Sequence, residues 1–434
     1  MLLPKVLIIG ESFNHTQGGG ITLCSLFKGW DREKLAVACS GYSLLGNIDT
    51  RICSNYYQLG YNENKWRFPF NFLQRKYYSG PLKFDEEKIK NITIAKSKIR
   101  IKIIMNFFYP LLEYFGLYHY FQKSEISKDF RYWLKDFNPD VIYVQATSRA
   151  EILFCLSVHS YLQKPLIYHV MDDWPSIISQ KGLFKKFWKK KIDKDLRSLL
   201  SIATILMSIS EEMAREYKTR YNKTFITFHN AINIDFWKKH QRENYDINNN
   251  PSILYAGRLG LGINDSLELF AKAIQQVNEE LSISIKFILQ TQEKPLWTNN
   301  YENVVYNNFL PHSEMPEVFA KADFLLLPYD FSDNSIKFIK YSMPTKAPEY
   351  MISGTPIIIF APDVTAVVKY AQEYKWAKVI TENNISEITI TIKNLIKNKE
   401  LRQQIAENAK KIAEEKHNSI KVSNEFKSLI CSLT

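Results

Sequence analysis

The sequence predicts an α/β protein made of two Rossmann-like domains. Short apolar runs such as residues 5–9 and 357–360 are typical of strands buried on both faces of a parallel sheet. Stretches between such runs, for example residues 265–277, place apolar residues with the period of an amphipathic helix. The length of 434 residues allows two or three domains. Alternation of strands and helices along the chain favours parallel sheets covered by helices.

Composition narrows the class of partner and the compartment. The 57 basic and 45 acidic residues give a net charge of +12, which favours nucleic acid, an anionic membrane surface or a phosphorylated substrate. The five cysteines are far apart and lack metal-site spacing, so we expect reduced thiols in a cytoplasmic protein. No apolar run reaches about 18 residues, and the N-terminal run is too short for a signal peptide. We therefore expect no transmembrane helix.

The first domain is expected to open with a strand at residues 5–9, a loop, and a helix at residues 21–30. The loop contains Gly18, Gly19 and Gly20, which do not form the G-x-G-x-x-G pattern of dinucleotide binding. Three consecutive glycines do let a backbone approach a ligand closely, because no Cβ stands in the way. A flexible turn without a ligand is the alternative.

Another candidate site follows a strand predicted at residues 165–170. The sequence HVMDDWP begins with His169 and lies at the carboxyl edge of the sheet, where α/β proteins bind ligands. A structural and a catalytic role are both open for His169. Asp172 and Asp173 also resemble a metal-binding pair, but we do not expect a metal site. Three further strands are expected in this domain, at residues 35–39, 140–145 and 203–210. Residues 50–95 show no pattern that places helices or strands.

Two segments combine basic and aromatic residues. Residues 96–121 interleave Lys and Arg with Ile, Phe and Tyr, and residues 182–197 place apolar residues at 184, 187, 188 and 192 on one helical face with Lys on the other. This pattern suits a helix lying on an anionic membrane surface. The alternative is an ordinary solvated basic face. Nothing else in the chain resembles a module that reads nucleic acid, so we expect no nucleic-acid partner.

The second domain is expected to follow a charged, Asn-rich linker at residues 238–250. Its first strand, at residues 252–255, leads into Gly257, Arg258 and Leu259. The remaining elements are expected as a strand at 283–289, a strand and edge at 304–310, a helix at 313–321, a strand at 322–328 and a helix at 400–416.

The most informative stretch is residues 341–360, YSMPTKAPEYMISGTPIIIF. Thr345 can cap a short helix that ends at Gly354, before a buried strand. The N-terminus of such a helix, together with the charge of Lys346, suits a phosphate. Glu349 lies one turn further, where a carboxylate can accept hydrogen bonds from a sugar diol. A helix cap before a core strand is the alternative.

This stretch resembles the donor-binding segment of retaining glycosyltransferases of family 4, which have the GT-B architecture. Glu349 matches the second Glu of that family's pattern, which implies that it holds the nucleotide ribose. Tyr341 stands where the first Glu is expected, with Asp330 and Asp333 nearby. One branch of the family has a Ser-x-Pro-Thr-Lys step, which this chain shows through Ser342, Pro344, Thr345 and Lys346.

The resemblance extends to other positions. Arg258 lies in a Gly-Arg-Leu step, which implies a contact with the donor diphosphate. The Lys expected after it is absent, because position 263 is Ile, and Lys346 can take its place. The backbone near Phe309 and Leu310 is implied to hold the nucleobase, and the glycine run is implied to lie beside the pyrophosphate. The candidate catalytic residues are His169, Asp172, Arg258 and Lys346.

The implied fold has two Rossmann-like domains facing across a cleft, at residues 1–240 and 241–415, and a C-terminal helix at 416–434 that returns to the first. The implied activity is metal-independent and cofactor-independent transfer of a hexose, with retention, from a nucleotide diphosphate sugar. The acceptor is expected to be a saccharide or a lipid-linked saccharide, in surface polysaccharide or lipopolysaccharide synthesis at the inner face of the plasma membrane. A nucleotide-sugar epimerase and a non-catalytic subunit that binds donor or lipid are the alternatives.

Overall fold

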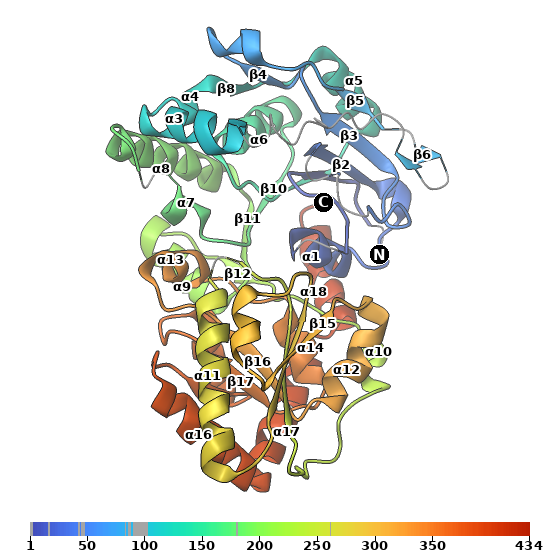
Figure 1. Ribbon diagram of the computed structural model, residues 1–434. Coiled ribbons are helices and arrows are strands. Elements are labelled where there is room, and N and C mark those ends of the chain that lie inside the picture. The colour runs from blue at the N-terminus through green and yellow to red at the C-terminus, as the bar shows by residue number, and fades with distance from the viewer. Residues whose placement is uncertain are drawn as a thin grey trace. The chain divides into compact units, whose positions relative to one another are not determined.

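The computed structural model describes residues 3–15, 18–41, 44, 48–82, 84–85, 88–89, 103–178, 181–260 and 262–434 (Figure 1). The chain folds into two compact units. The first contains Met1–Phe228 and Ser423–Thr434, and the second contains His229–Val422. The C-terminal residues therefore return to the first unit. The division after Phe228 comes before the boundary predicted at residue 240.

A parallel sheet forms the centre of the first unit. In spatial order its strands are β12 (Ile226–Thr227), β11 (Ile205–Ser208), β10 (Leu166–Val170), β9 (Val141–Val144), β1 (Val6–Ile9), β2 (Leu35–Ser40), β3 (Asn55–Leu59) and β5 (Gly80–Pro81). All neighbours pair in parallel except β3 and β5. The five strands predicted in this unit are confirmed within two residues. The strand order reverses between β1 and β9, and such a switch point is where α/β sheets bind ligands.

Serine residues begin three helices of this unit. Ser127, Ser148 and Ser210 each accept a hydrogen bond from the backbone N–H three residues further on, as N-cap residues do. Each helix ends at a residue with positive φ. This conformation lets a backbone N–H at the helix end donate to a free carbonyl of the last turn. The helices around the sheet are α1 (Gly18–Leu26), η1 (Arg32–Lys34), α5 (Lys128–Phe137), α6 (Arg149–Leu162), α7 (Trp174–Ile177), α8 (Lys185–Ile202), α9 (Glu211–Tyr221) and α18 (Ser419–Cys431).

Aromatic packing holds α18 on the first unit. The ring of Phe426 lies 5.0 Å from that of Phe27, 5.7 Å from that of Phe228 and 6.0 Å from that of Tyr143. These edge-on contacts are the favoured geometry for aromatic pairs. Phe426 and Phe27 are fully buried, so α18 completes the core of this unit.

A smaller layer is built from segments in which the sequence predicts few helices or strands. It comprises β4 (Asn64–Trp66), η2 (Phe70–Leu73), the π-helical η3 (Ile104–Phe108), α3 (Tyr109–Tyr114), α4 (Tyr118–Phe121) and β8 (Gln122–Ser124). β4 and β8 pair antiparallel, and a short pair of strands, β6 (Phe84–Asp85) and β7 (Lys88–Ile89), follows β5. Residues 96–102 of the predicted basic segment lie outside the described residues.

Helix α8 corrects one prediction. The four apolar residues at 184, 187, 188 and 192 do not share an exposed face, because Trp188 and Ile192 are buried while Phe184 and Phe187 are exposed. Trp188 donates its indole N–H to Gly116 O and packs against His119, which turns that side of the helix inward. No helix among the described residues combines the length and the apolar character needed to cross a bilayer.

The second unit contains a fully parallel six-stranded sheet within its described residues. In spatial order the strands are β15 (Val304–Asn308), β14 (Lys286–Thr291), β13 (Ser252–Ala256), β16 (Phe324–Pro328), β17 (Ile357–Phe360) and β18 (Lys378–Ile380). The order reverses between β13 and β16, which makes the crevice beyond their carboxyl ends the favoured ligand position.

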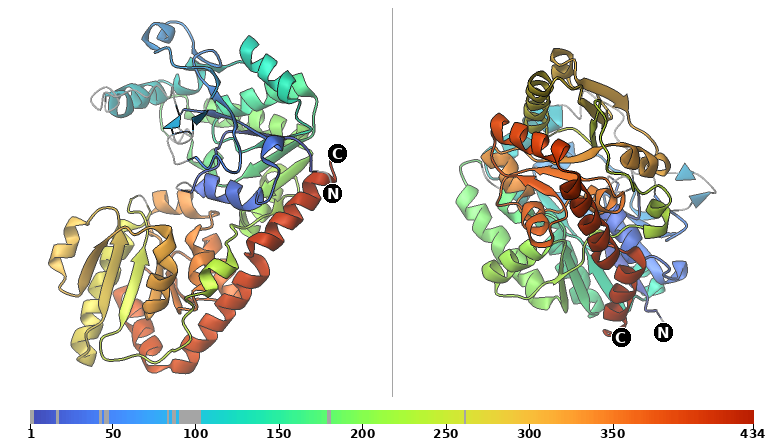
Figure 2. Two further views of the ribbon diagram at one scale, coloured as in Figure 1. Left: turned by 90° about the vertical axis from the view of Figure 1, so that its right-hand side faces the viewer. Right: turned by 90° about the horizontal axis from the view of Figure 1, so that it is seen from below.

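Helices cover both faces of this sheet (Figure 2). α11 packs against α16, and α14 packs against α17. Leu267, Phe270 and Ile274 of α11 are fully buried against the strands, so its predicted amphipathic pattern is confirmed. The helices are α10 (Ile234–Lys238), α11 (Asn264–Leu281), η4 (Leu296–Asn300), η5 (His312–Glu314), α12 (Met315–Lys321), α13 (Asp333–Ile339), α14 (Lys346–Ile352), α15 (Ala366–Tyr374), α16 (Ile385–Lys397) and α17 (Lys399–Lys416).

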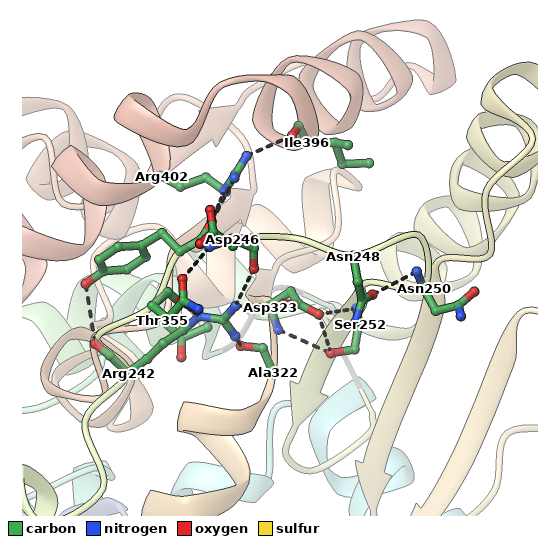
Figure 3. Close-up of polar contacts among 12 residues, drawn as sticks. Arg242, Asp246, Asn248, Asn250, Ser252, Ala322, Asp323, Thr355, Ile396 and Arg402 are labelled. Atoms are coloured by element: carbon green, nitrogen blue, oxygen red, sulfur yellow. Dashed lines mark hydrogen bonds and ion pairs between the residues drawn. The ribbon is translucent and has the colours of Figure 1, made fainter.

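The segment predicted as a linker, residues 238–250, is instead fastened to the second unit (Figure 3). The Arg242 guanidinium donates to Asp323 Oδ1 at 2.8 Å and to Ala322 O at 2.6 Å. Asp323 also accepts a bond from Ser252 N, and Arg402 donates to Tyr245 O at 2.7 Å. The charged, Asn-rich composition predicts a linker because such residues are usually solvated. In the structure, however, Arg242 of the segment donates to Ala322 O, and Arg402 donates to Tyr245 O of the segment.

Candidate functional site

The carboxyl edge of the second unit's sheet brings together several residues singled out in the sequence. Gly257 and Arg258 directly follow β13, and Asp330 follows the neighbouring β16. Arg258 is exposed, and its guanidinium forms no hydrogen bond or ion pair with any described residue. A cation that is unpaired at a topological switch point is available to an anionic ligand.

Lys346 lies beside these residues at the first position of α14. Its Nζ is 5.5 Å from the centroid of the Tyr255 ring. A Cβ added at Gly257 would lie 2.0 Å from this Nζ, so the ammonium keeps its present position against the backbone because residue 257 is a glycine. Burial is the main cause that lowers the pKa of Lys346 to about 8; the charge of Arg258 adds to this, and that of Glu349 opposes it. Two cations and a carboxylate are thus electrostatically coupled at this edge.

The start of α14 differs from the prediction. Thr345 occupies the N-cap position, but its side chain makes no capping hydrogen bond, because its backbone is already helical with φ −59° and ψ −24°. The N–H of Ala347 donates to Pro344 O instead. Ser342 Oγ lies 3.4 Å from Phe338 O, within its own turn. The charge of Lys346 is thus present at this terminus as predicted, whereas the Thr345 side-chain cap is not.

Glu349 has a partner that the sequence did not reveal. Its Oε1 lies 3.2 Å from Nε2 of His312, and the hydrogen bond to Glu349 raises the pKa of His312. The imidazole stacks on Phe236, with ring centroids 5.3 Å apart and planes inclined by 10°. Phe309 and Leu310 follow β15 on the way to His312, and Phe309 is half exposed. Glu349 is therefore held in place at the same strand edge.

Tyr341 stands at the position where the first Glu of the family's pattern is expected. Tyr341 is buried, and the Lys340 ammonium lies 4.9 Å from its ring centroid. Asp330 has a structural partner, because its Oδ1 accepts a 2.9 Å bond from Ser266 N and so holds the first turn of α11. Burial raises the pKa of Asp330. Asp333 is the first residue of α13 and is exposed.

The switch point of the first unit lies at Gly10 and Gln145, which follow β1 and β9. Gly10 has φ +106°, and a Cβ there would lie 2.4 Å from Gln145 O. Gly18, Gly19 and Gly20, predicted as a loop, form the first turn of α1 instead.

Close packing accounts for two of these three glycines. A Cβ at Gly20 would lie 2.1 Å from Asn14 Nδ2, and one at Gly19 would lie 2.9 Å from a carboxylate oxygen of Glu11 and 3.0 Å from Gln145 Oε1. The glycines therefore let the helix start approach polar side chains. The sequence predicts a loop at these three positions because glycine is a poor helix former.

His169 is a core residue, only 1% exposed. Its Nδ1 lies 2.5 Å from the Tyr143 hydroxyl, which accepts a bond from Gln145 Nε2. The Nε2 of His169 is buried without a hydrogen-bond partner among the described residues. Burial lowers the pKa of His169 to about 3, so the imidazole is neutral. Tyr143 and His169 together orient the Gln145 amide towards the start of α1.

Asp172 and Asp173 have different surroundings. Asp172 is exposed. Asp173 is buried, accepts bonds from Arg220 at 2.8 and 3.1 Å, and accepts further bonds from Tyr217 and Ser176. This set of partners accounts for Asp173 as a structural residue. Within the described part of the chain, no three His, Cys, Asp or Glu side chains gather as a metal site would require.

Comparisons with known proteins agree with this architecture. Residues 250–398 match the family Glycosyl transferases group 1. No curated protein sequence matches the chain. HepE from Anabaena, solved in complex with UDP, is 13% identical, with a TM-score of 0.59 over 99% of this chain and 100% of HepE.

Two further solved structures share the fold. WaaG, a glycosyltransferase involved in lipopolysaccharide biosynthesis, is 13% identical, with a TM-score of 0.56 over 98% of this chain and 99% of WaaG. A Listeria monocytogenes protein described as a UDP-N-acetylglucosamine 2-epimerase is 13% identical, with a TM-score of 0.51 over 99% and 96% of the two chains. The predicted GT-B fold is confirmed, and the family match supports a GT-B glycosyltransferase.

Proposed function

We propose that the protein transfers a hexose, with retention and without a metal, from a nucleotide diphosphate sugar to a saccharide or lipid-linked saccharide. The observation that carries this proposal is the placement of Lys346, Arg258 and Glu349 at one switch point of a parallel sheet. A nucleotide sugar offers a diphosphate for the two cations and a ribose diol for the carboxylate. Binding of UDP by HepE, together with the role of WaaG, supports a nucleotide-sugar donor and a pathway such as surface polysaccharide or lipopolysaccharide synthesis.

The proposed chemistry is electrostatic. As the bond from the sugar to the phosphate breaks, negative charge grows on the departing diphosphate, and preorganised cations stabilise that charge. Lys346 and Arg258 supply the cations without reorganisation. The departing phosphate oxygen accepts the proton of the acceptor hydroxyl, so no protein nucleophile is required. His169 is neutral and buried, and we assign it the positioning of Gln145 through Tyr143 rather than proton transfer. Asp172 stays a candidate on the acceptor side.

The test is donor turnover by the full-length protein across UDP-, GDP-, ADP- and dTDP-sugars, without added acceptor. We expect one donor to bind and to be slowly hydrolysed to free sugar. Lys346→Ala should lower this turnover about 100-fold or more, as loss of a preorganised charge does. Lys272→Ala removes an exposed lysine of α11 in the same unit and should leave turnover unchanged.

Other outcomes would overturn the proposal. Return of the sugar as a different nucleotide sugar would establish an epimerase. Absence of binding at about millimolar donor, well above usual KM values, would favour a non-catalytic subunit. Once an acceptor is found, the anomeric configuration of the product tests retention.

A further inference from the structure

The smaller layer of the first unit presents large apolar side chains to solvent. Together with the start of α8, this layer exposes five aromatic rings and a leucine from three segments far apart in sequence, and each is more than half exposed: Phe68, Phe72, Phe107, Leu111, Phe184 and Phe187. We call these six residues the aromatic face. Scattered apolar residues on a surface are normal, but a concentrated set marks a site of interaction with protein or membrane.

Packing beneath the aromatic face makes the three segments one body. Trp66 stacks on Phe108 with ring centroids 5.9 Å apart, and Phe121 packs edge-on against Trp66 at 5.1 Å. These contacts join residues 66–73 to residues 104–121.

The third segment is attached to the second through α3 and the glycine after it. Leu183 N donates to Tyr114 O at 2.8 Å, and a Cβ at Gly116 would lie 2.7 Å from the Cβ of Phe184. Figure 1 shows β4, α3, α4 and α8 gathered at one end of this unit. The exposed rings are therefore held on a buried framework, while their own faces remain in solvent.

Charge around the aromatic face is strongly one-sided. Residues 65–76, 103–123 and 181–192 contain eleven Lys or Arg residues and one acidic residue, Glu113. The first turns of α8 expose Lys185, Lys186, Lys189 and Lys190, and none of these four makes an ion pair with a described residue. Such lysines are free to approach anionic groups outside the protein.

We propose that the aromatic face docks on the surface of a bilayer containing anionic lipids. Aromatic side chains favour the boundary between headgroups and acyl chains, while lysines beside them attract anionic headgroups. A second copy of the chain is a poorer occupant, because two faces with this excess of positive charge repel each other. The face lies wholly in the first unit, so membrane binding and donor turnover can be lost independently.

This surface differs from the one expected from the sequence. Trp188 and Ile192 are buried and do not contact lipid, whereas Phe68 and Phe72 belong to a segment for which no element was predicted. Helical periodicity alone could not place these residues, because the short η2 turn carries no repeat.

Flotation of the full-length protein with vesicles tests the proposal. We expect binding to phosphatidylcholine vesicles that contain phosphatidylglycerol, and weak binding to phosphatidylcholine alone. Binding should weaken as salt is added, because the ions screen the lysines. Phe107→Ser with Leu111→Ser should abolish flotation. Lys186→Gln with Lys190→Gln should weaken it about fivefold per lysine, since a lysine near an anionic surface contributes about a fivefold change in affinity.

Matched variants in the second unit serve as controls. Ile390→Ser removes an exposed apolar residue of α16, and Lys272→Gln with Lys397→Gln removes two exposed lysines; none of these should change flotation. Circular dichroism and donor binding show that each variant is folded. Flotation that persists in the Phe107, Leu111 variant, or equal binding to both vesicle types, would overturn the proposal. If the Phe107, Leu111 variant loses a dimer that the wild type forms but still floats with vesicles, the aromatic face would be assigned to contact with a second copy of the chain.

Discussion

The Nε2 atom of His312 lies 3.2 Å from Oε1 of Glu349, and the imidazole is stacked on Phe236. This arrangement fixes the carboxylate that the proposed function assigns to the donor ribose. His312→Ala should therefore raise the KM for donor about tenfold, the size of a lost charge-assisted hydrogen bond, while kcat changes little. His312→Gln keeps an N–H donor and should restore most of the affinity. Steady-state kinetics with the donor identified from the panel would measure both, and an unchanged KM in His312→Ala would contradict the positioning role.

The same pair predicts a pH dependence of stability. The hydrogen bond to Glu349 raises the pKa of His312 above its ordinary value of 6.5 in the folded protein. The stabilisation is fully present below about pH 6.5 and is lost as the pH rises through the folded-state pKa, because the folded state then releases the extra proton. The thermal midpoint of the wild type should fall relative to that of His312→Gln between about pH 6 and pH 8. Parallel curves for the two proteins would show that the pair does not affect stability.

We predict that donor affinity declines at alkaline pH because Lys346 loses its positive charge. Its pKa is about 8 in the folded protein, chiefly because of burial, against an ordinary value of 10.5. The ammonium is lost as the pH rises through about 8, so donor affinity should decline there. Lys346→Arg stays charged over this range and should show a flat profile even if its affinity is lower. Calorimetric titration with the nucleotide diphosphate would distinguish the two, and a decline retained in the Arg variant would assign it to another group.

We predict that the position of the Lys346 ammonium depends on the glycine at position 257. In Gly257→Ala the new Cβ would lie 2.0 Å from Lys346 Nζ and 2.7 Å from the Tyr255 hydroxyl. The lysine must move, and donor affinity should fall about 10- to 100-fold, with a stability cost of about 1–3 kcal/mol from crowding. Gly41→Ala is the control, because its nearest neighbour would be at an ordinary 3.5 Å. Undiminished donor affinity in Gly257→Ala would show that the close approach is not required.

Substitution of Asp173 tests whether this residue has a structural role rather than a metal-binding one. Its carboxylate is buried and pairs with Arg220 at 2.8 Å. Asp173→Ala leaves the arginine uncompensated and should lower the free energy of unfolding of the first unit by about 3–5 kcal/mol. The exposed neighbour provides the control, because Asp172→Ala should change stability by less than about 0.5 kcal/mol. Denaturant unfolding measures both, and equal stability of the two variants would refute the assignment.

Much of the architecture could be predicted because buried strands and helices have characteristic local patterns of apolar residues. The runs at residues 5–9, 165–170 and 357–360 became central strands, since a strand covered on both faces must be apolar along its whole length. The predicted helix at residues 265–277 lies within α11, because its apolar period marks the side that is buried against the sheet. Lys346 and Glu349 could be found because they share one short helix with a recognisable sequence.

The sequence by itself thus determined the α/β class, the principal strands and the choice of Arg258 and Lys346 as candidate donor-binding cations. The tertiary structure alone decided which groups meet across the chain: His312 with Glu349 over 37 positions, Asp330 with the first turn of α11, and three separate segments beneath one aromatic face. It also turned Gly19 and Gly20 from loop residues into a helix start, because their neighbours come from elsewhere in the fold. Periodicity records whether a residue is buried, whereas the identity of its partner depends on packing between distant segments.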